Sequence, residues 1–514
     1  MLPEYRNPFE EVGIIVKDSG FIGRGQELQR AKTFRNYGNL AVIGGYSIGK
    51  SSLVYHAFCN PSQLKDLQDL GVLAVIIDLS EFEDPESFFR DILKEFLRQL
   101  KKTEIPNDIL LILKDIIDNA CQPNILWEEL RGWVKDFFET TKDSGYRMKL
   151  IVDEFDSATS VFKHKRICLQ TLRSLSDNYN TTFVVISRRT LRRIEDSIPG
   201  LSTFHQLFTE IFLSVFNTNE LELYFQHLEQ FLGNSNYSKK RHLSDQDRGL
   251  IINYCGGHPF LLTKLGNQIA YDLFYYNILD IRKSFLQVAR EFKDFYERIL
   301  TFLDEGEELE KLFQVLFGPR LTTSMLDARI LASYGLIRLD ENERYTAFSN
   351  HFQRYLWYKE RNIEPDSLFK VVEKELRLLI DHVLQEHYKT QDWIQKLIEE
   401  RHPLANEVLN LALENLNQDD LLLADTTVSP LDYTGFMGLF AIISCHYLLF
   451  KDVFPSDSSG FKQYWDPRFE AICKIRNAMA HNQSLEILHA KEVNQAKIYL
   501  QNLQELINHY FQTK

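Results

Sequence analysis

GGYSIGKSS, residues 44–52, decides the fold of this 514-residue chain. It satisfies the pattern G-x-x-x-x-G-K-[ST], and it lies between the apolar run NLAVIGG at 39–45 and the helical run SSLVYHAF at 51–58. Glycines let such a loop curl until its N–H groups point at a phosphate, and the following helix N-terminus adds positive potential. The pattern therefore predicts a phosphate-binding loop between a buried strand and a helix.

The residues of this loop also indicate which cofactors the protein binds. Lys50 is placed to reach the β- and γ-phosphates, and the Ser51 hydroxyl is placed to ligate magnesium. We therefore expect ATP or ADP together with Mg²⁺. The residues expected to contact the nucleotide in this loop are Gly44, Gly45, Gly49, Lys50, Ser51 and Ser52.

Residues 20–217 alternate short apolar runs with helical patterns. The runs are NLAVIGG at 39–45, GVLAVIIDL at 71–79, MKLIVDEF at 148–155, TTFVVIS at 181–187 and IFLSVF at 211–216. Continuously apolar runs rich in Val and Ile are typical of strands that are buried on both faces. This rhythm predicts an α/β core around a parallel sheet.

The run LIVDEFD at 150–156 ends in carboxylates that are expected near the phosphate loop. Asp153 is the candidate for the magnesium shell. Glu154 is placed to polarise the attacking water, which favours hydrolysis over binding alone. The alternative is that Glu154 is only a carboxylate at a strand end.

The fourth run ends in Ser187-Arg188-Arg189, followed by Arg192-Arg193, the densest positive patch in the chain. A polar group at this strand end is positioned to sense the γ-phosphate, so Arg188 and Arg189 are candidates for nucleotide contact. The alternative is a plain solvated face.

The remaining chain is organised in three further parts after an N-terminal segment at 1–19. Residues 218–300 read as a helical lid with one break at CGGHPF, 255–260. Residues 301–360 show short helical patterns, then GLIRLDENERYTAFS at 335–349, two runs joined by a polar turn, and a helical tail, which together outline a winged helix. After the polar stretch RNIEPDS, residues 366–514 read as an all-helical domain.

Residues 20–360 resemble a STAND-class P-loop NTPase of the AAA-related branch. FIGRGQEL at 21–28 and GGHPF at 256–260 match the family's first segment and its G-x-P lid motif. The resemblance implies that Gly23 and Arg24 lie near the base or ribose, that Pro259 packs on the adenine and that His258 reads the phosphate state. His258 is equally well explained as a surface histidine.

The same resemblance implies a nucleotide switch. Its ADP form is closed, ATP opens it, and opened protomers assemble into a homo-oligomer. The sensor region that commonly follows the winged helix is not recognised in this sequence. The resemblance therefore does not identify the activating signal, and a separate protein partner that supplies the sensor is one possibility.

KIRNAMAHNQ, residues 474–483, places Arg476 and His481 five positions apart. About one chance match to R-x-x-x-x-H is expected in a chain with this many Arg and His residues, and Arg377 and His382 supply a decoy. Positions five apart on a straight helix diverge by roughly 140°. A shared cleft therefore needs a frayed helix or two copies that meet across a two-fold axis.

Histidine and arginine suit metal-independent RNA cleavage, in which the 2′-hydroxyl needs a base and the phosphate needs a cation. The matching features of residues 366–514 are LFKVVEKELRLLIDHVL at 368–384 with Trp393 after it, DYTGF at 432–436 and the closing Arg-Asn-x-x-x-His. On these features the segment resembles a HEPN domain, a family made up mostly of homodimeric ribonucleases. That resemblance gives catalytic roles to Arg476, Asn477 and His481. The domain holds 14 Lys and Arg against 21 Asp and Glu. The resulting net charge of −7 repels the negatively charged backbone of free RNA.

The whole chain carries a net charge of −13, which argues against non-specific coating of nucleic acid. Six cysteines without a CxxC pair favour a reducing, cytoplasmic compartment. The apolar stretch at 433–450 is better explained as a buried helix at a dimer interface than as a membrane span, so no membrane partner is expected.

Together these features favour an ATP-controlled endoribonuclease effector, and the resemblances imply a role in prokaryotic antiviral defence or a toxin-like system. The second hypothesis is an ATP-dependent oligomerising scaffold whose HEPN domain only dimerises or binds nucleic acid. A DNA-binding ATPase that uses the winged helix is a third, although ERYTAFSNHFQRYLWYKER at 343–361 is not notably basic.

Overall fold

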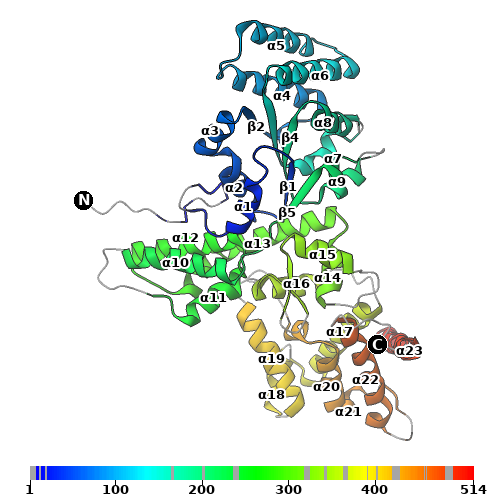
Figure 1. Ribbon diagram of the computed structural model, residues 1–514. Helices are drawn as coiled ribbons and strands as arrows, with labels where there is room; N and C mark the ends of the chain where they lie inside the picture. The colour runs from blue at the N-terminus through cyan, green and yellow to red at the C-terminus, as the bar shows by residue number, and fades with distance from the viewer. Residues whose placement is uncertain are drawn as a thin grey trace. The chain divides into compact units, whose positions relative to one another are not determined.

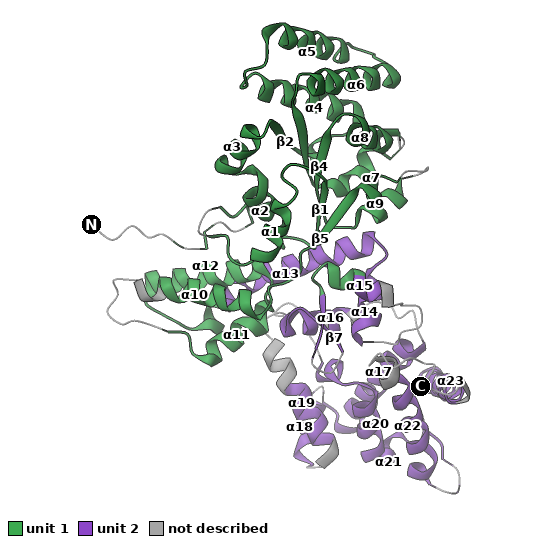
Figure 2. Cartoon of the chain, in the orientation of Figure 1, with its two compact units in different colours: residues 1–284, 330–336 green, residues 285–329, 337–514 purple. Residues whose placement is uncertain are grey.

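A computed structural model gives the fold of the chain. It describes residues 7, 9–10, 13–17, 20–163, 167–198, 203–234, 242–317, 325–340, 344–362, 368–390, 392–400, 403–419, 429–456, 458, 460–480 and 490–513. The chain forms two compact units, which Figure 2 colours separately. Unit 1 comprises residues 1–284 and 330–336, and unit 2 comprises residues 285–329 and 337–514.

Unit 1 is built on a five-stranded parallel sheet with the strand order β2-β3-β4-β1-β5. The strands are β1 (Asn39–Ile43), β2 (Val72–Asp78), β3 (Arg147–Asp153), β4 (Thr181–Ser187) and β5 (Phe208–Phe212). The predicted parallel sheet is thus confirmed. The fifth strand begins three residues earlier than the apolar run at 211–216 and ends at Phe212.

Successive residues of each inner strand enter opposite cores, because side chains alternate across a strand. On β1, Leu40 and Val42 are fully buried in one apolar cluster, whereas Ala41 and Ile43 are fully buried in another. β3 and β4 alternate in the same way. Burial on both faces explains why these strands read as continuous apolar runs.

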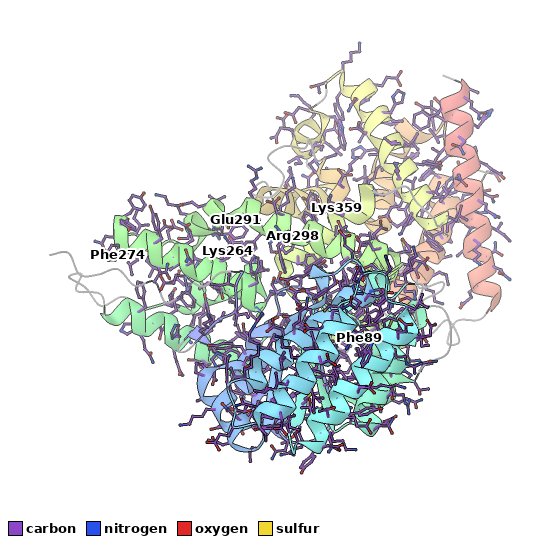
Figure 3. All side chains as sticks on the ribbon, turned by 90° about the horizontal axis from the view of Figure 1, so that it is seen from above. Phe89, Lys264, Phe274, Glu291, Arg298 and Lys359 are labelled. Atoms are coloured by element: carbon purple, nitrogen blue, oxygen red, sulfur yellow. The ribbon has the colours of Figure 1, made fainter. Side chains whose placement is uncertain are left out.

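Helices cover both faces of this sheet. One face holds α1 (Gly25–Lys32), α2 (Lys50–Val54) and the π-helix η2 (Tyr55–Cys59). The other holds α4 (Pro85–Leu100), α5 (Asn107–Ala120), α6 (Trp127–Asp143), α7 (Ala158–Val161), α8 (Ile167–Asn178) and α9 (Leu191–Ser197). α4, α5 and α6 lie together in Figure 1, and Phe89 of α4, labelled in Figure 3, is fully buried among them.

Three further helices complete the main part of unit 1: α10 (Thr218–Asn234), α11 (Asp245–Cys255) and α12 (Pro259–Tyr276). The predicted break at 255–260 is the turn between α11 and α12. Gly256 ends α11 in the left-handed conformation with a φ of 57°, and Pro259 begins α12 at a position that tolerates proline. Helix α3 (Pro61–Asp69) packs against β2.

Unit 2 opens with α13 (Ile281–Glu305), whose first residues belong to unit 1. It continues with α14 (Leu309–Phe317), α15 (Met325–Ser333), β6 (Ile337–Leu339), β7 (Tyr345–Ala347) and α16 (Asn350–Asn362). The residues of α15 from position 330 onward belong to unit 1. β6 and β7 pair antiparallel. Lys359 of α16, labelled in Figure 3, lies 2.6 Å from the Glu297 carboxylate of α13. Assignment of 301–360 as a winged helix stays a prediction.

The C-terminal part of unit 2 is all-helical in its described residues. It contains α17 (Leu368–Tyr388), α18 (Trp393–Glu399), α19 (Pro403–Asp419), α20 (Phe436–Cys445), α21 (Tyr447–Phe450), α22 (Phe461–Ala480) and α23 (Ala490–Thr513). Their apolar faces share one core, in which Phe440 stacks on Phe469 at 3.9 Å between ring centroids.

The apolar stretch at 433–450 does not form one buried helix. It is divided into α20 and α21 by a turn at His446, and Met437 and Leu448 are more than 60% exposed. Within the described ranges, no helix combines the length and the apolar character needed to cross a membrane.

Candidate nucleotide-binding site

The glycine-rich loop follows β1 directly and leads into α2. Gly49 ends the loop with a φ of 97°, and Ser47 also takes a positive φ, of 48°. Glycine adopts such angles without steric cost, so the loop curls tightly before the helix begins at Lys50. Gly49, Lys50 and Ser51, at the N-terminus of α2, line a polar pocket, as a phosphate site requires.

Lys50 lies at the start of α2 with its ammonium turned back over the loop. Its Nζ donates a 2.8 Å hydrogen bond to the Gly45 carbonyl. Burial lowers the pKa of Lys50, and the nearby carboxylates of Asp156 and Glu154 oppose that shift. The cation is thus held at the loop among negative groups, where a phosphate would compete for it.

Ser51 and Asp153 meet where a magnesium ion would be held. The Ser51 hydroxyl donates a 2.8 Å hydrogen bond to Asp153 Oδ2. Asp153 ends β3, and the strand order puts the carboxyl ends of β1 and β3 at one sheet edge, with β4 between them. A hydroxyl and a carboxylate are oxygen ligands of the kind Mg²⁺ takes, so these two residues fit the ion.

Glu154 follows Asp153 in an unusual backbone conformation. Its φ is 49°, in the left-handed region that costs a non-glycine residue about 1–3 kcal/mol. The Glu154 N–H donates to Asp153 Oδ1 at 2.8 Å, which helps to hold this turn. Burial raises the pKa of the Glu154 carboxyl, while Arg188 and Lys50 oppose the rise.

Arg188 follows β4 and faces these carboxylates. Its Nη2 lies 3.0 Å from Glu154 Oε2, and its guanidinium carbon lies 4.6 Å from the centroid of the Tyr46 ring. Asp156, only 7% exposed, accepts the main-chain N–H groups of Arg188 at 2.7 Å and of Arg189 at 3.1 Å. Arg188 is therefore anchored at its backbone and directed toward the phosphate loop.

These groups line one polar pocket of about 1070 Å³. Its lining includes Tyr46, Ser47, Gly49, Lys50, Ser51, Asp153, Glu154 and Arg188, together with Gly13–Val16 and three residues of α12. The convergence of a P-loop, a hydroxyl, carboxylates and an arginine at the carboxyl edge of a parallel sheet is the arrangement of a P-loop NTPase. Unit 1 has this fold.

An apolar pocket of about 620 Å³ adjoins the polar one and shares Val16, Ile48, Gly49, Ser52, Pro259 and Thr263 with it. The remaining lining includes Phe9, Phe21, Phe216, Tyr224 and Leu262. Planar aromatic and aliphatic walls of this kind suit a purine base. Pro259 thus contacts both pockets, at the start of α12.

Arg24 and Gly23 occupy different positions at the apolar pocket. Arg24 lines it, and its guanidinium donates to the Ile48 carbonyl at 3.1 Å and to the Ser214 carbonyl. Gly23 packs behind, where a Cβ would lie 3.1 Å from the Glu220 carboxylate. Glu220 in turn accepts the Arg24 N–H at 2.7 Å. The structure thus brings Arg24 to the pocket wall, whereas Gly23 allows this close packing.

His258 is not a surface residue, because only 3% of it is exposed. Burial lowers its pKa to about 3, and the Arg24 charge adds to the shift. The imidazole is therefore neutral near pH 7. It precedes Pro259 at the start of α12, beside the Tyr46 backbone.

The remaining predicted residues differ in position: Ser52 lines both pockets, whereas Gly44 lines neither. The missing Cβ of Gly44 would meet the Leu213 carbonyl oxygen at 2.6 Å. Ser52 is 7% exposed, and its Oγ accepts the Val16 N–H at 3.0 Å. Arg189 is held through its N–H by Asp156 and is not part of either pocket's lining.

The second predicted site is only partly described. Arg476 lies on α22 with a half-buried side chain, and Asn477 follows it on the same helix. His481 lies outside the described residues. The decoy Arg377 is explained by structure: its Nε donates to the Leu431 carbonyl at 3.0 Å, and its Nη2 donates to Glu373 Oε1 at 2.6 Å.

Sequence reasoning missed three parts of the nucleotide site. Tyr46 stacks on Arg188, Asp156 anchors the end of β4, and Gly13–Val16 lines the polar pocket. Asp156 was visible as the third carboxylate of LIVDEFD. The role of Gly13–Val16 had no signal, because the segment carries neither a motif nor a clear periodicity.

Comparison with known proteins gives fold-level likenesses. No family model matches the chain, and no curated protein matches it. The Walker-type ATPase PABY2304 of Pyrococcus abyssi is 12% identical, with a TM-score of 0.45 over 66% of this chain and 97% of that one. The ADPNP–ADP complex of the Aeropyrum pernix ORC2 protein is 14% identical, with a TM-score of 0.37 over 69% and 98%.

AMPPCP-bound DnaA from Aquifex aeolicus is also similar. It is 12% identical, with a TM-score of 0.30 over 77% of this chain and 96% of that one. At such low identity and TM-score, what the site can do follows from its own residues.

Proposed function

We propose that this chain is an ATP-hydrolysing switch whose nucleotide state controls an RNA-cleaving C-terminal domain. The observation that supports the ATPase part is the convergence of Lys50, Ser51, Asp153, Glu154 and Arg188 on one pocket. The adjoining apolar pocket accommodates the base, and the polar pocket accommodates the phosphates. The two pockets share walls, as one bound nucleotide requires.

Each residue has a physical role in hydrolysis. The loop N–H groups and Lys50 hold the phosphates, and Ser51 and Asp153 hold Mg²⁺, which neutralises phosphate charge when bound. Glu154 orients and polarises the attacking water, and Arg188 contacts the terminal phosphate. The raised pKa of the Glu154 carboxyl favours this role, because a more basic carboxylate accepts a proton more readily.

The experiment that tests this part measures nucleotide binding and phosphate release by the full chain. Lys50→Ala should weaken ATP affinity about tenfold or more, because it removes a charge-assisted contact. Glu154→Gln should retain binding but lower turnover about a hundredfold. ATP hydrolysis that is unchanged in Lys50→Ala protein would overturn the assignment.

The RNase part of the proposal concerns the helical domain of unit 2. In this reading His481 moves the proton of the ribose 2′-hydroxyl, Arg476 stabilises the charge on the phosphate, and Asn477 orients the phosphate. The half-buried position of Arg476 on α22 favours it, since no ion pair or hydrogen bond holds Arg476 among the described residues. An arginine available for a ligand fits a substrate role better than a structural one.

Pairing of two copies belongs to the same proposal. Positions five apart would not share a face of a straight helix, so in this proposal a dimer brings Arg476 of one copy and His481 of the other to one linkage. Nucleotide-driven assembly would then set the cutting arrangement. This links the ATPase to the nuclease without a direct contact between their sites.

RNA integrity in cells that express the protein tests the RNase part. Wild type should degrade RNA and slow growth, and Arg476→Ala and Lys50→Ala should both spare the RNA. Lys474→Ala is the matched control, because Lys474 is a cation of the same helix that is 59% exposed and paired with Glu492 at 3.0 Å. It should behave as wild type.

The competing function is an ATP-dependent scaffold whose HEPN-like domain dimerises or binds nucleic acid without cutting. The net charge of −7 in residues 366–514 favours it, because this field repels free RNA. RNA that stays intact with wild-type protein, while ATP still changes the oligomeric state, would support the scaffold. A role in antiviral defence or a toxin-like system belongs only to the effector reading.

A further inference from the structure

We infer that Arg188 is a positioning residue that exchanges Glu154 for the terminal phosphate of ATP, so that Glu154 is released for catalysis only when that phosphate is present. This inference rests on the proposed ATP hydrolysis and concerns its control. The residues involved belong to unit 1 and line one pocket.

The first observation is the ion pair itself. Arg188 Nη2 lies 3.0 Å from Glu154 Oε2, the carboxylate placed to activate water. A guanidinium at this distance occupies the carboxylate oxygen that would otherwise contact a water molecule. In this arrangement the carboxylate proposed as the general base is held by a cation.

The second observation is that the main chain of Arg188 is fixed, whereas the end of its guanidinium can exchange partners. Asp156, 7% exposed, accepts the Arg188 N–H at 2.7 Å and lies 3.5 Å from Nε. The Glu154 side chain, in contrast, is 43% exposed. Half-exposed ion pairs contribute little to stability, whereas buried charged hydrogen bonds are costly to break. The contact with Glu154 is therefore the one that gives way.

The third observation is the direction of the guanidinium. It lies over the ring of Tyr46, a residue of the phosphate loop, and it shares the polar pocket with Lys50. The pair with Glu154 therefore lies where the phosphate chain of a nucleotide is expected. A terminal phosphate offers more negative charge and better geometry to a guanidinium than one carboxylate does.

The main chain of Glu154 is held in place, so the exchange moves side chains only. Its left-handed turn, with φ at 49°, is held by the Asp153 Oδ1 hydrogen bond and by the Ser157 N–H, which donates to the Glu154 carbonyl at 2.9 Å. When ATP takes Arg188, the Glu154 carboxylate loses its cation while its main chain stays in place. ADP lacks the terminal phosphate, so the pair closes again.

A double-mutant cycle on nucleotide affinity tests this exchange. The dissociation constants of ADP and of a non-hydrolysable ATP analogue are measured for wild type, Glu154→Gln, Arg188→Gln and the double variant. Glu154→Gln should raise the preference for the ATP analogue over ADP about threefold, because the phosphate no longer competes with a carboxylate. Arg188→Gln should lower that preference about tenfold.

In the Arg188→Gln background, Glu154→Gln should have no further effect on the preference. Arg188→Gln keeps a side chain that can hydrogen-bond Asp156, and Arg188→Lys is the second variant if the glutamine protein does not fold. Asp196→Asn is the matched control, because it removes one carboxylate from the exposed pair of Arg192 and Asp196 on α9. It should leave all affinities unchanged.

Two outcomes overturn the inference, and they differ from failure of the proposed function. An equal effect of Glu154→Gln with and without Arg188 would mean that Glu154 repels the phosphate directly. No effect of Glu154→Gln in either background would mean that the pair does not compete with nucleotide. Wild-type protein that binds neither nucleotide would instead refute the ATPase proposal itself.

Discussion

The main-chain N–H of Gly45 donates a 3.1 Å hydrogen bond to the carbonyl of Tyr334. Gly45 lies in the glycine-rich loop, and Tyr334 begins the turn after α15 in the segment 330–336, which groups with unit 1 (Figure 2). The carbonyl of the same glycine accepts the Lys50 ammonium. One residue of the loop thus contacts both Lys50 and a segment nearly three hundred positions later.

Gly45→Ala is expected to break this contact. The added methyl would lie 2.4 Å from the Tyr334 carbonyl oxygen, a distance that real Cβ atoms do not show, so the backbone must shift. Overpacking of this kind typically costs about 1–3 kcal/mol, so the midpoint of thermal unfolding of unit 1 should fall, and nucleotide affinity should fall with it. Thermal unfolding with and without ATP measures both.

Gly132→Ala is the matched control for this prediction. Gly132 lies inside α6 with no atom within 4 Å of an added Cβ. Alanine is the better helix former by about 1 kcal/mol, so this variant should be slightly stabilised and should bind nucleotide normally. A Gly45→Ala protein as stable as wild type would mean that the turn at 330–336 adapts freely.

Asp153→Asn should abolish the magnesium dependence of nucleotide binding. Asp153 and Ser51 are the proposed oxygen ligands, which meet at 2.8 Å, and an amide binds Mg²⁺ far less well than a carboxylate does. Wild type should bind ATP about tenfold more tightly with Mg²⁺ than with a chelator, whereas Asp153→Asn should show nearly equal affinities. Titration of a fluorescent ATP analogue in both buffers measures this.

Asp69→Asn at the end of α3 provides the control, because it removes an exposed carboxylate that lines neither pocket. It should retain the full response to Mg²⁺. A response that survives in Asp153→Asn protein would place the ion on other ligands.

The inner strands were predictable because burial on both faces imposes a continuous apolar run. β5 was misplaced by three residues for the opposite reason. It is an edge strand, and its first residues, Phe208-Thr209-Glu210, include polar side chains that an inner strand would exclude. A search for continuous apolar runs therefore predicts the first residue of β5 too late in the sequence.

The candidate site was predictable where chemistry and spacing coincide. Lys50, Ser51, Asp153 and Glu154 follow strand ends, so the sheet alone brings them together. Tyr46 and Asp156 were not assigned, because their roles depend on where β4 ends beside the loop, which no local pattern states. The decoy Arg377 shows the converse: its spacing to His382 resembles a site, but its guanidinium holds main-chain carbonyls.

His258 should make the protein sensitive to acid. Its pKa is about 3 in the fold and about 6.5 in an unfolded chain, so the unfolded state binds more protons between these values. Stability should therefore fall as pH drops below 6.5, at most by about 1.4 kcal/mol per pH unit, and should be flat above it with respect to this group.

The measurement compares wild type with His258→Gln by denaturant unfolding at pH 5, 6, 7 and 8. The stability difference between the two should change from pH 7 to pH 5 and stay constant from pH 7 to pH 8. A difference that also changes above pH 7 would mean that the imidazole titrates in the folded state near neutrality.

Lys149 should make the stability of the protein depend on pH above neutrality. It lies fully buried on β3, where its Nζ donates to the Phe34 carbonyl at 3.0 Å and to Thr182 Oγ1 at 2.8 Å. Burial lowers its pKa to about 7, and the charge of Arg147 adds to the shift. Because a free lysine titrates near 10.4, the unfolded state holds more protons between about pH 7 and pH 10.

The sign follows from that proton balance. The cost of burying the charged lysine is fully present below the folded pKa, near pH 7, and is relieved as pH rises toward 10, so stability should increase over this window. Lys149→Met removes the titrating group and should flatten the rise, although the Phe34 carbonyl then loses a partner. Parallel unfolding of wild type and Lys149→Met from pH 7 to pH 9.5 measures this, and equal slopes would show that Lys149 stays charged when buried.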